Sequence, residues 1–182
     1  MQPYTCRRAQ AADMNSVANF CLQTQDTYYD AVGKARIVWD QTLRNKVLNQ
    51  FHTTVALASP TSKKIVGVMI MQFFPPRVVI HGISTDKALT DRERIGIGRS
   101  LLYQGYQACN DAGITWGEGE CITNNTLIRE TFEGVGLCKI EERGWTPATS
   151  ITPVSKPLIW HIEIGRIDEA YRTALLKSIE AL

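Results

Sequence analysis

The sequence lacks most of the features that mark specialised classes of protein. It has no apolar run near the ~18 residues that a membrane span needs. It also has no strong charge of one sign, since 20 lysine and arginine residues against 18 aspartate and glutamate residues give a net charge of +2. That balance gives no argument for a nucleic acid or an anionic membrane as a partner. The N-terminus has no apolar segment of the secretory type, so we expect a cytoplasmic protein.

Patterns that hold metals or disulfides are also scarce. The five cysteines are odd in number, widely spaced and never arranged as Cys-x-x-Cys, and there are only three histidines. This pattern favours reduced cysteines buried as small apolar side chains. It predicts neither a disulfide framework nor a metal site.

What remains is the composition of an ordinary globular protein. The chain has 182 residues, of which 44% are hydrophobic and 21% charged, and we expect one domain over residues 1–182. Apolar spacing predicts strands over 4–9, 53–58, 64–74, 77–85, 114–122, 137–143 and 158–164. It predicts helices over 11–22, 26–51, 91–112, 125–135 and 166–182. This order indicates a mixed α/β fold with an antiparallel meander first and a β-α-β crossover after it.

The strand expected over 64–74 is apolar at both parities. Ile65, Met69, Met71 and Phe73 share one parity, and Val66, Val68 and Ile70 share the other. A strand of this kind is covered on both faces, so we expect helices on both sides of the sheet.

A glycine-containing segment stands between a strand and a helix, Arg94-Ile95-Gly96-Ile97-Gly98-Arg99-Ser100. Glycines let the backbone approach a ligand closely, and the first N–H groups of a helix point outward at its positive end. Such a turn can hold a phosphate, with added charge from Arg94 and Arg99. A glycine turn with no ligand is the alternative. A Walker A loop is excluded because no Gly-Lys-Ser/Thr follows, and a Rossmann turn lacks its third glycine.

This segment resembles the acetyl-CoA-binding motif of the GNAT N-acetyltransferase superfamily, Gln/Arg-x-x-Gly-x-Gly/Ala. The stretch Asn125–Leu137 is similar to the family's following helix, turn and strand, and the order of elements agrees over residues 4–164. The resemblance implies a GNAT-like fold, with a mostly antiparallel sheet of about six to seven strands, flanking helices and an extra C-terminal helix over 166–182. Four features depart from the pattern: Glu93 replaces Gln or Arg, the loop Asp86–Asp91 is a few residues longer, Phe132 replaces a frequent tyrosine acid, and Leu137 replaces a phenylalanine.

The resemblance also implies a function. The chain would transfer an acetyl group from acetyl-CoA, as co-substrate, to a primary amine of a small molecule or protein. Backbone N–H groups from Arg94 to Ser100 would hold the pyrophosphate, and an N–H near Ile83 or Ser84 would stabilise the oxyanion. The implied cofactor-binding residues are Ile83, Ser84, Arg94, Gly96, Ile97, Gly98, Arg99, Ser100, Asn125 and Phe132.

The proton acceptor has several candidates. Glu118 and Glu120 share the parity of Trp116 and Ile122 on one strand, which indicates a polar cleft or, equally, a solvated strand edge. His81, on the preceding strand, has a suitable reference pKa near ~6.5, although a histidine there also suits the core or the surface. Ser84 completes the candidate catalytic set. The amine acceptor would sit between the segments Gln25–Gly33 and Gly144–Pro157, where the family has its variable walls.

Two other functions remain open from the sequence. Phe132 is compatible with a non-catalytic module that binds acyl-CoA, and the basic residues of Lys34–Lys46 and Arg92–Arg99 are compatible with a nucleic-acid-modifying enzyme. The near-neutral net charge counts against the second. The acceptor is not identified by any motif, and both a monomer and a homodimer fit the sequence. We expect the C-terminal helix to pack on its own sheet.

Overall fold

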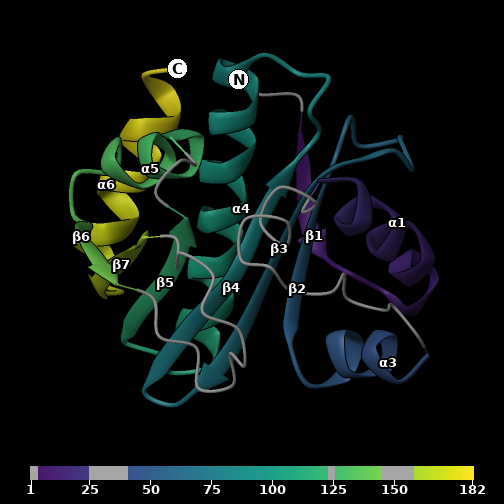
Figure 1. Ribbon diagram of the computed structural model, residues 1–182, viewed down its shortest axis with the longest axis horizontal. Helices are drawn as coiled ribbons and strands as arrows, with labels where there is room; N and C mark the ends of the chain where they lie inside the picture. Colours follow the sequence, from purple (N-terminus) through teal and green to yellow (C-terminus); the bar gives the residue numbers. More distant parts are fainter. Residues whose placement is uncertain (1–3, 25–40, 123–125, 145–157) are drawn as a thin grey trace.

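The computed structural model describes residues 4–24, 41–122, 126–144 and 158–182 and shows a seven-stranded sheet with helices on both faces (Figure 1). The sheet has the order β1-β2-β3-β4-β5-β7-β6, and β4 and β5 are parallel neighbours in an otherwise antiparallel arrangement. The mixed α/β fold with an initial meander is therefore confirmed. The strands are β1 (Thr5–Arg8), β2 (His52–Leu57), β3 (Ile65–Phe74), β4 (Arg77–Thr85), β5 (Trp116–Ile122), β6 (Lys139–Gly144) and β7 (Leu158–Arg166).

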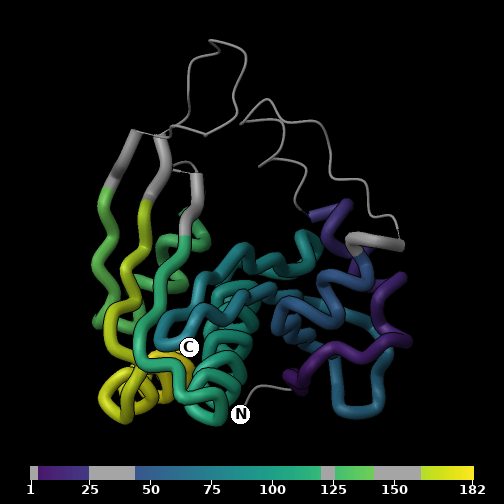
Figure 2. The backbone as a smooth tube through the Cα atoms, turned by 90° about the horizontal axis from the view of Figure 1, so that it is seen from below, coloured from purple at the N-terminus to yellow at the C-terminus, as the bar shows by residue number. Residues whose placement is uncertain are grey.

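The helices divide between the two sides of the molecule. In both ribbon and tube views, α4 runs centrally, α6 lies on the side of β5, β7 and β6, and α1 and α3 lie on the side of β1 and β2 (Figures 1 and 2). Of the helix expected over 26–51, the described part is α3, and residues 25–40 lie outside the described ranges. The helices are η1 (Ala11–Asp13), α1 (Met14–Thr24), α3 (Gln41–Asn49), α4 (Asp91–Asp111), α5 (Thr126–Glu133) and α6 (Glu169–Glu180).

Two apolar cores lie on opposite faces of the sheet. One contains Val55 of β2 and Val68 of β3 together with Val17 and Cys21 of α1. The other is lined by Ala56, Met69, Met71, Val78, Ile80, Ile97 and Leu101, the last two from α4. Successive strand residues alternate between these cores because side chains on a strand point to opposite faces. The expectation that β3 is covered on both faces is confirmed.

A bulge changes the alternation at the start of β3. Ala56 pairs with Gly67 and Leu57 with Ile65, so Val66 is one extra residue in the ladder. Ile65 therefore joins the α1-side core, while Val66 joins the α4-side core. Strict alternation in the sequence assigned these two residues to the opposite faces, and the inserted residue is the physical reason for the difference.

The C-terminal helix packs on its own sheet, as expected. Tyr171 and Leu175 of α6 are buried in the α4-side core beside Cys109 and Ile164. Within the described residues, no helix is long and apolar enough to cross a membrane.

Candidate active site

Two parallel neighbours, β4 and β5, separate part-way along their length. They pair over four residues each, from Arg77 opposite Trp116 to Ile80 opposite Gly119. Beyond that point, residues 82–85 of β4 pair with β3, and residues 120–122 of β5 pair with β7. In the described part of the chain the two facing edges are not joined to each other. Their backbone N–H and C=O groups are therefore available to an extended ligand, which pairs with a strand edge as another strand does.

A second bulge coincides with the start of this opening. Met71 of β3 pairs with Ile80, and Ile70 pairs with Gly82, so His81 is the extra residue of β4. A bulge bends its strand and increases the local twist, and bulges are frequent beside active sites. His81 is also the first residue after the last β4–β5 pair. The bulge is thus the local cause that turns β4 away from β5.

The His81 side chain is held in a defined position. Its Nε2 lies 2.9 Å from Oε1 of Gln72, and its ring centroid lies 5.2 Å from that of Phe51. In the assigned amide orientation Oε1 only accepts, so Nε2 carries the proton and Nδ1 has the free lone pair. Desolvation, and then the nearby charge of Lys46, lower the pKa of His81 below the usual value of 6.5. The imidazole is therefore neutral at neutral pH.

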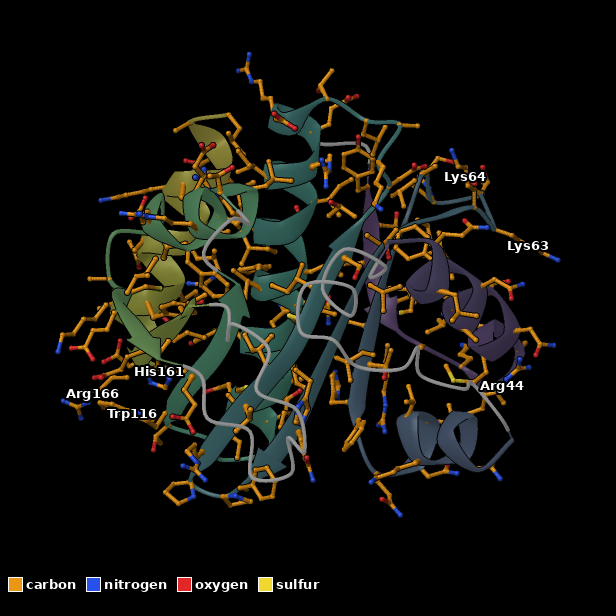
Figure 3. All side chains as sticks on the ribbon, viewed as in Figure 1. Arg44, Lys63, Lys64, Trp116, His161 and Arg166 are labelled. Atoms are coloured by element: carbon orange, nitrogen blue, oxygen red, sulfur yellow. The ribbon has the colours of Figure 1, made fainter. Side chains whose placement is uncertain are left out.

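Glu118 lies on β5 just before the opening. Its Oε1 pairs with Arg77 of β4 at 3.0 Å, and its Oε2 lies 3.8 Å from Nε2 of His161 on β7. Figure 3 shows His161 at the same side of the molecule as Trp116 and Arg166. The carboxylate is therefore engaged by a cation rather than isolated in an apolar pocket.

His161 is a residue that the sequence analysis missed. Its backbone lies directly opposite Glu120 of β5 and Glu141 of β6, and its side chain is 13% exposed. In the sequence the strand 158–164 was recognised from its apolar residues, and the parity shared by His161 and Glu163 was the available signal for a polar strand face.

The other candidates on the strands are placed by their backbones. Ile83 and Ser84 lie beyond the last β4–β5 pair, opposite Met69 and Val68 of β3, and Ser84 is buried. Glu120 follows that last pair on β5. Asn125 lies outside the described residues, as does nearly all of the two segments expected to line the acceptor.

The whole glycine motif lies inside the helix expected over 91–112, after its first residues. Thr90 is the N-cap of α4, and the Arg94 N–H already donates to the Thr90 carbonyl at 2.9 Å. The N–H groups after Arg94 are consequently used inside the helix, which corrects the expectation that the backbone from Arg94 to Ser100 cradles a pyrophosphate. The reason is the capping box of Thr90 and Glu93, which begins the helix before the glycines.

Four residues of this region make packing contacts inside the protein. A Cβ at Gly98 would lie 2.9 Å from the Thr131 methyl carbon, so this glycine permits the contact between α4 and α5. Arg99 is buried, and its guanidinium donates to the carbonyls of Thr131, Glu130 and Ser178. Phe132 is 2% exposed in the α4-side core, as Ile97 is at 0%. The guanidinium of Arg99, expected to add charge at a phosphate, is therefore committed to backbone carbonyls, and the cofactor contacts expected at Ile97 and Phe132 stay predictions.

Arg94 is the basic residue of the motif that stays near the surface. Its Nε donates to the Thr85 hydroxyl at 3.1 Å, and a terminal nitrogen lies 3.5 Å from Asp91. Ser100 donates to the Gly96 carbonyl one turn earlier in α4. Arg94 thus connects the end of β4 to the first turn of α4, beside the opening.

Thiol chemistry is not supported by the described cysteines. Burial raises the pKa of Cys6, Cys21, Cys109 and Cys138 to about 12, so these thiols are protonated at neutral pH. A protonated thiol is a poor nucleophile. The side chain of Cys121 is outside the described set.

Comparison with known proteins identifies this architecture. The fold is similar to a putative acetyltransferase from Salmonella typhimurium crystallised with acetyl-CoA, with a TM-score of 0.65, 15% identity, and 92% of this chain and 96% of that chain covered. It is also similar to a phosphinothricin acetyltransferase from Sinorhizobium meliloti in complex with acetyl-CoA, with a TM-score of 0.66, 16% identity and coverage of 91% and 89%.

A third similar structure is the ribosomal-protein-S18-alanine N-acetyltransferase from Escherichia coli, with a TM-score of 0.61, 13% identity and coverage of 89% and 93%. No protein-family model matches the sequence, and a search of curated proteins finds no match. The chain has the fold of the GNAT acetyltransferase superfamily, as the motifs predicted.

Proposed function

We propose that this chain transfers an acetyl group from acetyl-CoA to the primary amine of a small molecule or protein. The observation that carries the proposal is the opening between β4 and β5 within a GNAT fold. Coenzyme A has an extended arm with two amides, and the edge of residues 81–85 offers complementary N–H and C=O groups. Acetyl-CoA supplies the acetyl group activated as a thioester.

The free edge of β4 contributes to the reaction in two ways. Residues 81–85 align the arm, and a backbone N–H at Ile83 or Ser84 stabilises negative charge on the carbonyl oxygen under attack. The burial of Ser84 excludes water from this position and strengthens such a hydrogen bond.

His81 is the best-placed proton acceptor among the candidates. It stands at the mouth of the opening, and its lowered pKa keeps it neutral with a free Nδ1 lone pair. The bond between the amine nitrogen and the acetyl carbon forms as the carbon–sulfur bond of the thioester breaks, and the nitrogen loses a proton that Nδ1 accepts directly or through one water. The departing thiolate takes up a proton, from the imidazolium or from solvent, and coenzyme A leaves as its thiol. Glu118 is paired with Arg77, so we assign it to attracting a cationic acceptor rather than to proton transfer.

A non-catalytic acyl-CoA-binding module is the second candidate function. The observation that favours it is Phe132, which has no hydroxyl to protonate the departing sulfur and is buried in the core. A nucleic-acid-modifying role has less support, because burial of Arg99 removes one cation from the basic patch that it requires.

The domain organisation belongs to the same proposal. We expect residues 1–182 to act as one domain, with α6 as part of it. The support is that Tyr171 and Leu175 of α6 complete the core that also holds α4. A separate C-terminal unit would not share its core with the sheet.

The experiment combines binding with product detection. Calorimetry measures acetyl-CoA binding, and mass spectrometry measures acetylation of a panel of primary amines, including spermidine and a lysine peptide. His81→Gln keeps the binding and lowers turnover by about 100-fold or more. His52→Gln is the matched control, because His52 also has a pKa lowered by burial yet stacks on Phe73 away from the opening.

The possible results separate the functions. Product formation that is lost in His81→Gln and kept in His52→Gln supports the transferase. Binding of acetyl-CoA without any acetylated product supports the non-catalytic module. No binding of acetyl-CoA at millimolar concentration contradicts both and leaves the fold alone.

A further inference from the structure

Two N–H groups at the start of α4, those of Thr90 and Glu93, are occupied by side chains of the helix's own capping box. The Thr90 hydroxyl accepts from the Glu93 N–H at 3.3 Å. Oε2 of Glu93 accepts from the Thr90 N–H at 2.9 Å and from the Thr90 hydroxyl at 2.7 Å. The carbonyl of Thr90 accepts from Arg94. Two of the groups that a helix offers to an anion are thus already satisfied, and a carboxylate stands among them.

Charges of both signs stand at this helix end, since Arg92 and Arg94 accompany two carboxylates in the first turn, and the carboxylate of the capping box lies beside the donors. Asp91 and Glu93 are both in the first turn of α4. The two hydrogen bonds from Thr90 lower the pKa of Glu93, so the carboxylate is charged at neutral pH. Arg94, the nearest partly buried cation, is engaged by Asp91 and Thr85. A diphosphate that approached this end would have to displace Glu93 and would meet its negative charge.

The opening therefore fits one part of coenzyme A, whereas the helix end does not fit another. The edges of 81–85 and 120–122 fit the amide arm, whereas the start of α4 as it stands does not fit the diphosphate. We infer that Glu93 sets donor specificity, so that the chain binds acyl-pantetheine thioesters through the arm and gains little from the nucleotide end. This inference rests on the proposed function.

The test compares two donors on the complete chain. Calorimetry at pH 7.5 measures dissociation constants for acetyl-CoA and for S-acetylpantetheine, which lacks the diphosphate and the nucleotide. We expect the two constants to agree within about threefold for the wild-type protein. In Glu93→Arg the capping carboxylate is replaced by a cation, and we expect acetyl-CoA to bind about tenfold more tightly while S-acetylpantetheine is unchanged.

Two further variants make the result specific. Glu93→Gln keeps a side chain that can complete the capping box but removes the charge, and we expect an intermediate gain for acetyl-CoA. Asp111→Arg makes the same change of charge at the exposed far end of α4, and we expect no gain. Circular dichroism and the Tm of each variant verify that α4 is intact.

The outcomes distinguish the inference from the function. Wild-type protein that binds acetyl-CoA more than about 30-fold more tightly than S-acetylpantetheine overturns the inference and leaves the transferase standing. An equal gain in affinity for acetyl-CoA in Glu93→Arg and Asp111→Arg also overturns the inference, because the gain then comes from the overall charge of the protein. Failure of both donors to bind overturns the proposed function, and the inference with it.

Discussion

The guanidinium of Arg99, in the middle of α4, donates a 2.6 Å hydrogen bond to the backbone carbonyl of Ser178 in α6. The same side chain donates to the carbonyls of Glu130 and Thr131 near the end of α5. One cation thus joins three helices over the β5–β7 side of the sheet. Carbonyls near a helix C-terminus attract positive charge, which explains a buried arginine without a carboxylate partner.

Replacement of Arg99 is expected to destabilise the fold. Arg99→Met leaves three carbonyl groups without their donors, and we expect a loss of about 2–4 kcal/mol in the free energy of unfolding. Urea denaturation measures this loss. Arg92→Met, at an exposed position of the same helix, serves as the control and changes the value by less than about 0.5 kcal/mol. A loss below about 1 kcal/mol for Arg99→Met would show that the three bonds contribute little.

Variants of Gly98 distinguish a role in helix packing from a role in ligand binding. The Thr131 methyl would lie 2.9 Å from a Cβ at residue 98, so Gly98→Ala is destabilising by about 1 kcal/mol even though alanine favours helix. Thr131→Ser removes that methyl and keeps the hydroxyl that donates to the Leu127 carbonyl at 2.8 Å. In the Thr131→Ser background, Gly98→Ala should be neutral or stabilising by up to about 1 kcal/mol.

Thermal unfolding of the four proteins completes this cycle, and calorimetry with acetyl-CoA accompanies it. We expect the affinity to be equal in the wild type and in the Gly98→Ala/Thr131→Ser double variant. A selective loss of affinity in the double variant would contradict the packing role and return Gly98 to the cofactor site.

The fall of kcat/KM at acidic pH, the acid limb of the pH profile, should follow the protonation of His81. Its neutral form accepts the proton, and its pKa lies below 6.5, so kcat/KM should be flat near neutral pH and fall as the pH drops through that lowered pKa. Lys46→Gln removes one cause of the lowering, and we expect the limb to move upward by a few tenths of a pH unit. Lys63→Gln, an exposed lysine on the β2–β3 turn, is the control.

The same pKa has a consequence for stability. A histidine with a lowered pKa in the folded state is protonated more readily when unfolded. Stability from His81 is therefore complete above about pH 6.5 and is lost as the pH falls below it. In the pH profile of kcat/KM, an acid limb that does not move in Lys46→Gln would exclude His81 as the titrating group.

The sequence predicted the fold well because its signals there are local and periodic. The two apolar parities of β3 anticipated two covered faces, and the motifs around Gly96 and Phe132 anticipated the architecture. The start of α4 was predicted at residue 91, where Thr90-x-x-Glu93 forms a capping box, but the glycines inside the helix were interpreted as a turn that holds a phosphate.

The site was harder to predict because its contacts join distant residues. The partners of Arg99 lie 31, 32 and 79 residues away along the chain, and no local pattern indicates them. His161 approaches Glu118 only because β7 inserts between β5 and β6. Bulges add a further difficulty, since an inserted residue breaks the alternation from which a strand's faces are read.

Because His81 is an extra residue, the positions of β4 that face the α4-side core change from even to odd numbers at this point. Before it, the even-numbered Val78 and Ile80 face the α4-side core, and after it the odd-numbered Ile83 does. Deletion of His81 would join Ile80 directly to Gly82 and restore strict alternation, so Ile83 would keep its face and the pairs from Met71–Ile80 to Gly67–Thr85 would need no change. The residues on either side of His81 are therefore already in phase for a regular strand, and one inserted residue alone accounts for the bulge in β4.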